Sequence, residues 1–168
     1  MRIFTLFVLL SFLTVTIQAQ SIRKSGSKYV SITASQLKYG NDFGLQYEQY
    51  FSKGFSYFLK TVYEKSTVEL TSYNTYRLDV GSYKSISSSL DDLYLNIGIA
   101  GYLGQQFITN EYYPQEENFV YGIYLNPKIE YFIIDNLSLA LGLSTYFDFN
   151  SDFRNKHYSY SLTLSYQL

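Results

Sequence analysis

The last eleven residues of the chain, Tyr158 to Leu168, alternate without interruption between large apolar and small polar side chains. Successive side chains of an extended strand point to opposite faces, so this segment has one apolar face and one polar face. About 9 to 11 residues of tilted strand cross the hydrocarbon core of a bilayer. Tyrosine lies near both ends of the apolar face, where its ring and hydroxyl suit the level of the lipid headgroups. The segment predicts a strand of a transmembrane β-barrel.

Seven other segments have the same period of two and predict further strands. We expect an all-β fold, an antiparallel up-and-down transmembrane β-barrel of about eight strands with a plugged lumen. We expect loops at Lys65–Asn74, Ser82–Asp92 and Gln105–Asn118, and a bulge or a rim position at Pro127, because proline cannot donate to a ladder. The seven segments are Tyr29–Gln36, Phe43–Phe51, Phe55–Glu64, Tyr76–Val80, Leu93–Tyr102, Phe119–Tyr131 and Leu137–Phe149.

The composition separates a membrane barrel from a soluble one. Aromatic residues make up 20% of the chain and charged residues only 16%, where about 25% is typical of soluble domains. The polar face of the strands carries mostly Ser, Thr, Gly, Asn and Gln, whereas a face in water would carry Lys, Glu and Asp. No run of eighteen apolar residues follows the first segment, which argues against helical spans.

The first nineteen residues predict a signal peptide, and residues 20–168 predict the barrel domain. Arg2 gives a positive start, an apolar stretch follows, and Ala19 is a small residue before the expected cleavage site. The stretch is short for a membrane anchor, so we expect export to the outer membrane. The chain has no cysteine, and its net charge of −1 gives no basic surface for direct nucleic acid binding.

The longest expected loop is a candidate partner-facing surface. If the amino terminus of the barrel is periplasmic, the connections near Lys65, Gln105 and Asn150 lie outside the cell, in agreement with the usual asymmetry of loop lengths. The residues expected to face partners are Gln105, Asn110, Glu111, Glu116 and Glu117.

Six charged residues are expected to point into the lumen. A charge away from water must be paired, so three acids and three bases in a narrow lumen predict a neutralised structural network. A proton or ion relay is the alternative. The six are Glu48, Lys60, Arg77, Asp79, Lys128 and Glu130.

His157 and Ser159 form a His-x-Ser pair like that of an outer-membrane lipid A deacylase, with Asp148 or Asp152 near enough to orient the imidazole. Ser159, however, falls on the polar face, away from a lipid substrate. We therefore favour a solvated rim histidine and expect no catalytic residue. One histidine and no cysteine give no recognisable metal-ligand spacing, and no cofactor is expected.

The carboxyl-terminal half resembles the TraO family of conjugative-transposon proteins of the Bacteroides group, and weaker similarity reaches back to Tyr47 and Glu48. The family tends to have an arginine-rich patch where this chain has Ser144 to Asp148. The resemblance implies an envelope component of a DNA-transfer apparatus. It is carried by Leu95, Ile97, Gly98, Ala100, Gly101, Tyr102, Phe119, Val120, Tyr121, Gly122, Ile129, Glu130, Tyr131, Asp135 and His157.

Three functions follow as hypotheses. The first is a non-enzymatic outer-membrane barrel that forms a structural part of a conjugation apparatus, in contact with outer-membrane lipid and other envelope proteins. The second is a generic small surface barrel for adhesion or envelope integrity. The third is a lipid A-modifying enzyme.

Overall fold

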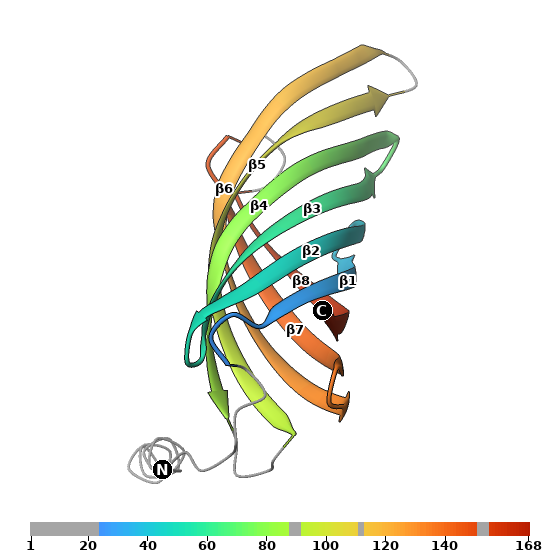
Figure 1. Ribbon diagram of the computed structural model, residues 1–168. Coiled ribbons are helices and arrows are strands. Elements are labelled where there is room, and N and C mark those ends of the chain that lie inside the picture. Colours follow the sequence, from blue (N-terminus) through green and yellow to red (C-terminus); the bar gives the residue numbers. More distant parts are fainter. Residues whose placement is uncertain (1–23, 88–91, 111–112, 151–154) are drawn as a thin grey trace, which may run out of the picture.

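The computed structural model describes residues 24–87, 92–110, 113–150 and 155–168. The predicted signal peptide lies outside them. The chain forms one closed antiparallel barrel in which each strand pairs with its neighbours in sequence and β1 pairs with β8 (Figure 1). The predicted all-β fold, an antiparallel up-and-down barrel of eight strands, is confirmed. The strands are β1 Lys28–Leu37, β2 Gly40–Ser52, β3 Phe55–Val68, β4 Thr71–Ser87, β5 Leu93–Asn110, β6 Tyr113–Ile134, β7 Leu137–Asp148 and β8 Lys156–Gln167.

The two ends of the barrel differ in what they carry. We call one the terminal end, because β1 begins there, β8 ends there, and the turns at 53–54 and 135–136 join strands there. The other is the tip end, with the turns at 38–39 and 69–70 and the far end of the β5–β6 hairpin. In β1 and β8, Leu168 donates its backbone N–H to the carbonyl of Lys28 at the terminal end. The register continues from there to the pair of Leu37 and Ser159.

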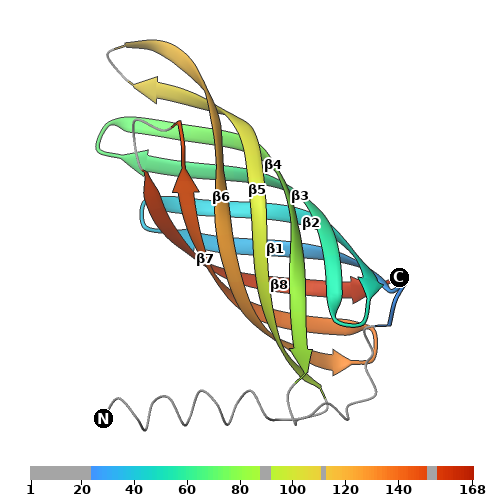
Figure 2. The same cartoon turned by 90° about the vertical axis from the view of Figure 1, so that its left-hand side faces the viewer.

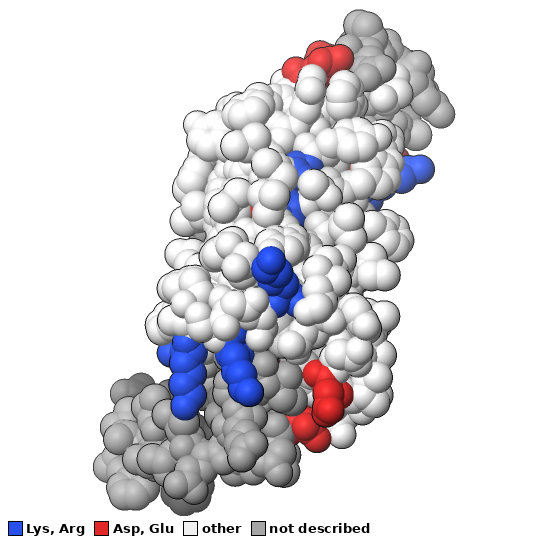
Figure 3. All heavy atoms as spheres, viewed as in Figure 1, with Lys and Arg blue, Asp and Glu red and all other residues white. Residues whose placement is uncertain are grey.

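The alternation read from the sequence gives the two faces of the barrel. Along β3, Ser56, Phe58, Lys60 and Val62 are buried, while Tyr57, Leu59 and Thr61 are exposed. Most of the face in Figure 3 is white, with acidic side chains at its two ends and a few separate basic side chains, one of them near the middle. A cylinder whose outer face is this apolar is stable when lipid, rather than water, surrounds it.

Aromatic side chains on the outer face gather toward the two ends. At the terminal end, the ring of Phe51 stacks on those of Phe55 and Tyr57. At the tip end, Tyr76 contacts Tyr63 and a further aromatic ring on β5. Leucine, isoleucine and valine occupy most of the outer face between them, as the row from Ile32 on β1 to Leu103 on β5 illustrates. Two aromatic belts around an aliphatic band are typical of a barrel that spans a bilayer.

The wall of the barrel is higher on one side. The strands β4, β5 and β6 have 17, 18 and 22 residues, whereas β1, β7 and β8 have 10, 12 and 12. The β5–β6 hairpin therefore rises above its neighbours at the tip end (Figure 2).

Most residues of the three predicted loops belong to strands, so these loop predictions are wrong. Lys65–Asn74 is the end of β3, a turn at 69–70 and the start of β4, and Gln105–Asn118 belongs to β5 and β6 apart from residues 111–112, which lie outside the description. Most of Ser82–Asp92 likewise belongs to β4. These segments keep the extended conformation beyond the expected membrane level because each one pairs with a neighbouring strand.

Pro127 lies in the middle of β6, opposite Ile97 of β5. The β6–β7 ladder lacks the pairs of Asn126 and Pro127 but resumes at Lys128 in the same register. The predicted bulge or rim position is therefore wrong. The ladder tolerates the missing N–H as a local gap, since the strands on both sides of the gap stay in register. Within the described ranges, no helix is long and apolar enough to cross a membrane.

Candidate functional site in the barrel lumen

All six charged residues predicted to face inward are buried on the lumenal side of the barrel. They come from β2, β3, β4 and β6, and the closed sheet brings them together although they span a large part of the sequence. Arg77 pairs with Asp79, Glu48 pairs with Lys128, and Glu130 is bonded to neutral polar side chains. The six are Glu48, Lys60, Arg77, Asp79, Lys128 and Glu130.

Arg77 is surrounded by carboxylates. Its Nη1 donates to Oε2 of Glu64 at 3.0 Å, its Nε lies 3.2 Å from Oδ1 of Asp79, and its Nη2 lies 3.6 Å from Oδ2 of Asp42. The same Nη2 donates to the hydroxyl of Tyr146 at 2.9 Å. The planar guanidinium has five N–H groups in a fixed fork, which suits it to several acceptors at once. One cation thus serves three buried acids.

Lys60 and Tyr124 complete the surroundings of Asp79. Lys60 of β3 is directly opposite Asp79 of β4 in the register. The Tyr124 hydroxyl on β6 donates to Oδ2 of Asp79 on β4 at 3.1 Å, across the intervening β5. Hydrogen bonds in the lumen therefore join strands that are not neighbours in the sheet.

Glu48 and Lys128 form the second ion pair, with 3.6 Å between Oε2 and Nζ. Glu48 also accepts hydrogen bonds from Gln46 at 3.1 Å and from Ser56 at 2.6 Å. The Lys128 ammonium lies 4.0 Å from the centre of the Tyr83 ring, within the range of a cation–π contact. Each charge of this pair has a further partner besides the other charge.

Glu130 lies toward the terminal end, next to a cluster of rings. It accepts hydrogen bonds from Asn96 at 2.9 Å and Ser138 at 2.5 Å. Asn96 in turn accepts from Ser85, whose hydroxyl is 3.0 Å from that of Tyr50. The buried rings of this cluster, which we call the terminal aromatic cluster, are Tyr29, Tyr50, Tyr94 and Phe132.

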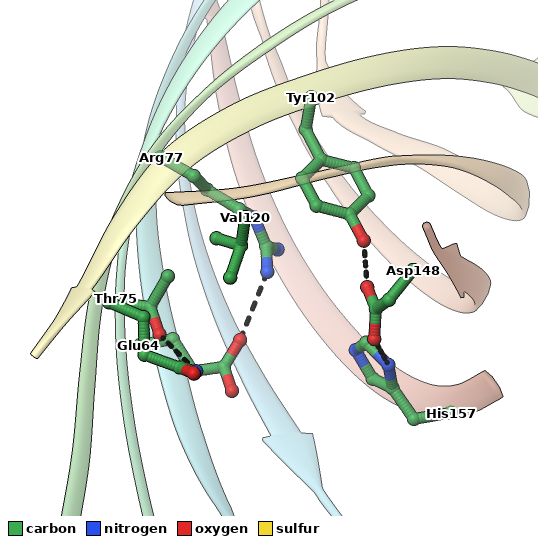
Figure 4. Close-up of a pocket in the computed structure, with 8 residues that line it drawn as sticks. Glu64, Thr75, Arg77, Tyr102, Val120, Asp148 and His157 are labelled. Atoms are coloured by element: carbon green, nitrogen blue, oxygen red, sulfur yellow. Dashed lines mark hydrogen bonds and ion pairs between the residues drawn. The ribbon is translucent and has the colours of Figure 1, made fainter. Parts of the chain in front are cut away.

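A small polar cavity lies in the lumen near the tip end (Figure 4). Its volume is about 20 Å³, which is room for roughly one water molecule. His157 and Asp148 line one side, with Nδ1 and Oδ2 3.1 Å apart, and Tyr102 donates to the other oxygen of Asp148. Arg77 and Glu64 line the other side.

His157 is not the solvated rim residue expected from the sequence. Its side chain is 8% exposed, and its ring stacks on that of Tyr146 with 4.5 Å between centres and 3° between planes. Asp148, one of the two candidate orienting residues, is its partner, and Asp152 lies outside the described residues. Ser159 is also buried on the lumenal face, 1% exposed. Neither member of the His-x-Ser pair faces the lipid, where an acyl substrate would lie.

Asp42, Glu64 and Asp148 were not among the predicted lumenal charges. The alternation in the sequence places all three on the inward side. Asp42 has the parity of Glu48 and lies one residue before the predicted strand Phe43–Phe51, and Glu64 has the parity of Lys60 and is the last residue of the predicted strand Phe55–Glu64. Asp148 is the last residue of β7 and has the inward parity of Ser144 and Tyr146 in the predicted strand Leu137–Phe149, and its side chain is 8% exposed.

The predicted partner-facing residues lie on strands rather than in a loop. Gln105 is exposed on β5, and its Nε2 donates to Oε2 of the exposed Glu117 on β6 at 2.7 Å. Glu116 is exposed beside it, and Asn110 donates to Thr71 at 2.9 Å. Glu111 lies outside the described residues. Within the described ranges, no group of three His, Cys, Asp or Glu residues is arranged to hold a metal ion.

Comparisons with known proteins support the fold. No family model and no curated protein matches the chain, so the resemblance to TraO has no support from these comparisons. Solved structures do match. They include the N-terminal β-barrel domain of Pseudomonas aeruginosa OprF, with 12% identity, a TM-score of 0.62, and coverage of 86% of this chain and 98% of that one.

Two further matches are bacterial surface barrels. Neisserial surface protein A has 9% identity and a TM-score of 0.67, with 86% of this chain and 97% of that one covered. Ail, the attachment invasion locus protein of Yersinia pestis, has 13% identity and a TM-score of 0.59, with 86% and 99% covered. At these identities the likeness establishes the fold, and it supports the predicted outer-membrane location. The chain has the fold of the small eight-stranded outer-membrane β-barrels.

Proposed function

We propose that the protein is a non-enzymatic barrel of the outer membrane, with a lumen that serves stability and a tall β5–β6 hairpin that contacts other envelope proteins. The observation that carries this proposal is the contrast between the two surfaces. The lumenal acids and bases engage one another inside the barrel, while the far end of β6 has an exposed edge.

The lumenal network supports a structural role. Lys128 of β6 pairs with Glu48 of β2 across the barrel, and Arg77 of β4 bonds to Glu64 of β3 and Tyr146 of β7. These contacts tie the strands together and leave a cavity with room for only about one water. An ion path would need a row of solvated groups instead. We infer a plugged lumen. Purified protein in a planar bilayer should give no steady conductance, and discrete single-channel currents would contradict this part of the proposal.

The edge of β6 supports the partner-binding role. β6 begins at Tyr113, but its register with β7 begins only at Gly122. Next to that start, Phe149 donates its N–H to the carbonyl of Tyr121, and Asn150 caps the carbonyl of Phe119. Beyond them the described part of the β6 edge has no paired strand, and Glu116 and Glu117 are exposed there. Backbone groups along an unpaired edge can pair with an extended segment of a partner, and two acids favour a basic one.

A conjugation apparatus is the partner that the sequence resemblance favours. Deletion of the gene from a mobile element should lower transfer to recipient cells while leaving growth unchanged, and complementation should restore it. A chain with Glu116 and Glu117 both replaced by Lys should fail to complement although it assembles normally. Unchanged transfer after deletion would remove the conjugation role and leave the barrel itself intact as a proposal.

Adhesion is the second candidate, and the match to Ail, whose name refers to attachment, favours it. One experiment distinguishes the adhesion role from the conjugation role. An adhesin lacking its hairpin tip should lose attachment of cells to a host surface in the absence of any mobile element, whereas a transfer component should not.

Location and orientation can be tested together. The folded barrel should migrate faster on a gel before boiling than after it. Single cysteines at Thr109 and Ser52 are a matched pair, because Thr109 is near the tip end and Ser52 at the terminal end. Only the cysteine at Thr109 should react with an impermeant reagent on intact cells. Labelling of Ser52→Cys instead would reverse the orientation.

A further inference from the structure

Two apolar depressions lie next to each other on the outer face of the barrel. The larger, of about 660 Å³, extends over β1 to β5, and the smaller, of about 400 Å³, extends over β7, β8, β1 and β2. Phe43 borders both, and 62% of its surface is exposed. The depressions therefore form a pair divided by one projecting ring.

A small residue explains each depression. Thr61 of β3 lies in register between Leu45 of β2 and Leu78 of β4. Ala34 of β1 lies in register between Phe43 of β2 and Leu162 of β8. A short side chain between two long ones lowers the surface, and dispersion contacts are lost there unless another molecule occupies the space.

A lysine follows each small residue at the same interval. Lys38 is four residues beyond Ala34, and Lys65 is four residues beyond Thr61, both toward the tip end. At about 3.3 Å per residue, each lysine is roughly 13 Å from the floor of its depression along the strand. Both lysines are exposed, and the Lys38 ammonium lies 4.7 Å from the centre of the Tyr39 ring.

The charges around these lysines favour an anion on the outer face. On β2 and β3, the acids Asp42, Glu48 and Glu64 point into the lumen, where they are buried. Glu69, in the turn between β3 and β4, is the exposed acid of this region. Exposed Gln36 and Asn41 line the smaller depression on its tip side and add neutral hydrogen-bonding groups. Apolar depressions below and cations above match an amphiphile with acyl chains and an anionic head.

We propose that the paired depressions bind acyl chains of the phosphorylated lipid A of lipopolysaccharide, and that Lys38 and Lys65 bind its phosphates. Lipid A carries several chains and phosphates on one sugar backbone, so one molecule fits two adjacent depressions and two cations. This inference rests on the proposed outer-membrane location, with the tip end in the outer leaflet.

The test uses the full-length barrel, purified in mild detergent and reconstituted into nanodiscs of phosphatidylethanolamine with a small fraction of bisphosphorylated lipid A. Lipid that stays with the protein after extraction is counted by mass spectrometry. Wild-type protein should retain lipid A above its bulk fraction. The pair Lys38→Gln and Lys65→Gln should lower retention about fivefold through the lost charge pairs. The pair Ala34→Leu and Thr61→Leu, which fills the depressions, should lower it at least about threefold.

Matched controls make the same changes elsewhere on the outer face. Lys84→Gln removes a lysine near the terminal end, where its Nζ lies 3.8 Å from the centre of the Phe55 ring. Val80→Leu adds bulk on β4 outside the depressions. Both should retain lipid A as the wild type does.

Three results would overturn the inference: no enrichment by the wild type, equal retention by the depression variants, or equal enrichment of phosphatidylglycerol in a parallel nanodisc. Heat-modifiable migration on a gel, checked for every variant, tests whether the barrel is folded and so tests the proposed function separately. A folded barrel that does not enrich lipid A would contradict only the proposed lipid A site.

Discussion

The two halves of the lumen are held together by different physics. Toward the tip end, one guanidinium is shared by Asp42, Glu64 and Asp79. Toward the terminal end, the rings of the terminal aromatic cluster contact one another edge to face, as Tyr29 does with Tyr50 at 5.7 Å. A shared cation concentrates stability in one residue, whereas packed rings distribute it over several. The halves should therefore respond differently to single substitutions.

The largest effect is expected from Arg77→Met. It leaves three buried carboxylates without their common cation, and removing one partner of a buried pair costs about 3 to 5 kcal/mol. We expect a loss of about 4 kcal/mol in the free energy of unfolding, measured by urea titration in lipid vesicles with gel migration as the readout. Arg77→Lys is the control and should lose roughly half as much, because an ammonium lacks the planar fork. If the two variants unfolded alike, the shared guanidinium would not be the central feature of this half.

Lys128→Met should cost less, about 2 kcal/mol. Glu48 keeps its hydrogen bonds from Gln46 and Ser56, so its carboxylate loses only its ion-pair partner. The same titration measures the effect, and the double variant with Glu48→Gln supplies the coupling between the two charges. A loss as large as that of Arg77→Met would mean that the two ion pairs are equivalent.

In the terminal aromatic cluster, Phe132→Leu should cost about 1 kcal/mol, because a similar volume remains and neighbouring rings can adjust. Ile133→Leu, on the lipid-facing side of the same strand, is the matched control and should change little. A loss above about 3 kcal/mol is typical of deleting a whole ring. Such a loss would show that the stability of this half also depends mainly on one residue.

The smallest effect is expected at the hairpin tip. Glu117→Gln should change the free energy of unfolding by less than about 0.5 kcal/mol, since the side chain is exposed. Its consequence should instead be seen in partner binding, measured by crosslinking on intact cells. A marked loss of stability would place the hairpin within the cooperative structure of the barrel.

The faces of the strands were predictable because alternation is a local property. Ser56, Lys60 and Leu59 fall on their observed faces from parity alone, and the inward position of Arg77 follows in the same way. The strand ends were not predictable. Polar stretches such as Lys65–Asn74 have the composition of a loop, yet pairing with a neighbouring strand, which is a tertiary effect, keeps them extended.

The partners of the lumenal charges were beyond the reach of the sequence. Arg77 and Tyr146 are 69 residues apart, and their contact depends on how far each strand is shifted against the next around the whole barrel. The alternation in the sequence predicts that both side chains point into the lumen, but not where along the barrel axis each one lies. For the same reason His157 was expected at the rim, although the register places it against Tyr146.

The pairing of β1 with β8 joins Tyr29 to Gln167, so the cylinder depends on a seam between the first and last strands of the sheet. That seam has the largest sequence separation in the ladder, and its closure carries the largest loop entropy. Until β8 has been delivered, β1 keeps a free edge that can recruit a foreign strand. We therefore expect the edge of the growing sheet to need protection until its final segment arrives, and a chain that ends before Tyr158 to remain an open sheet prone to aggregation.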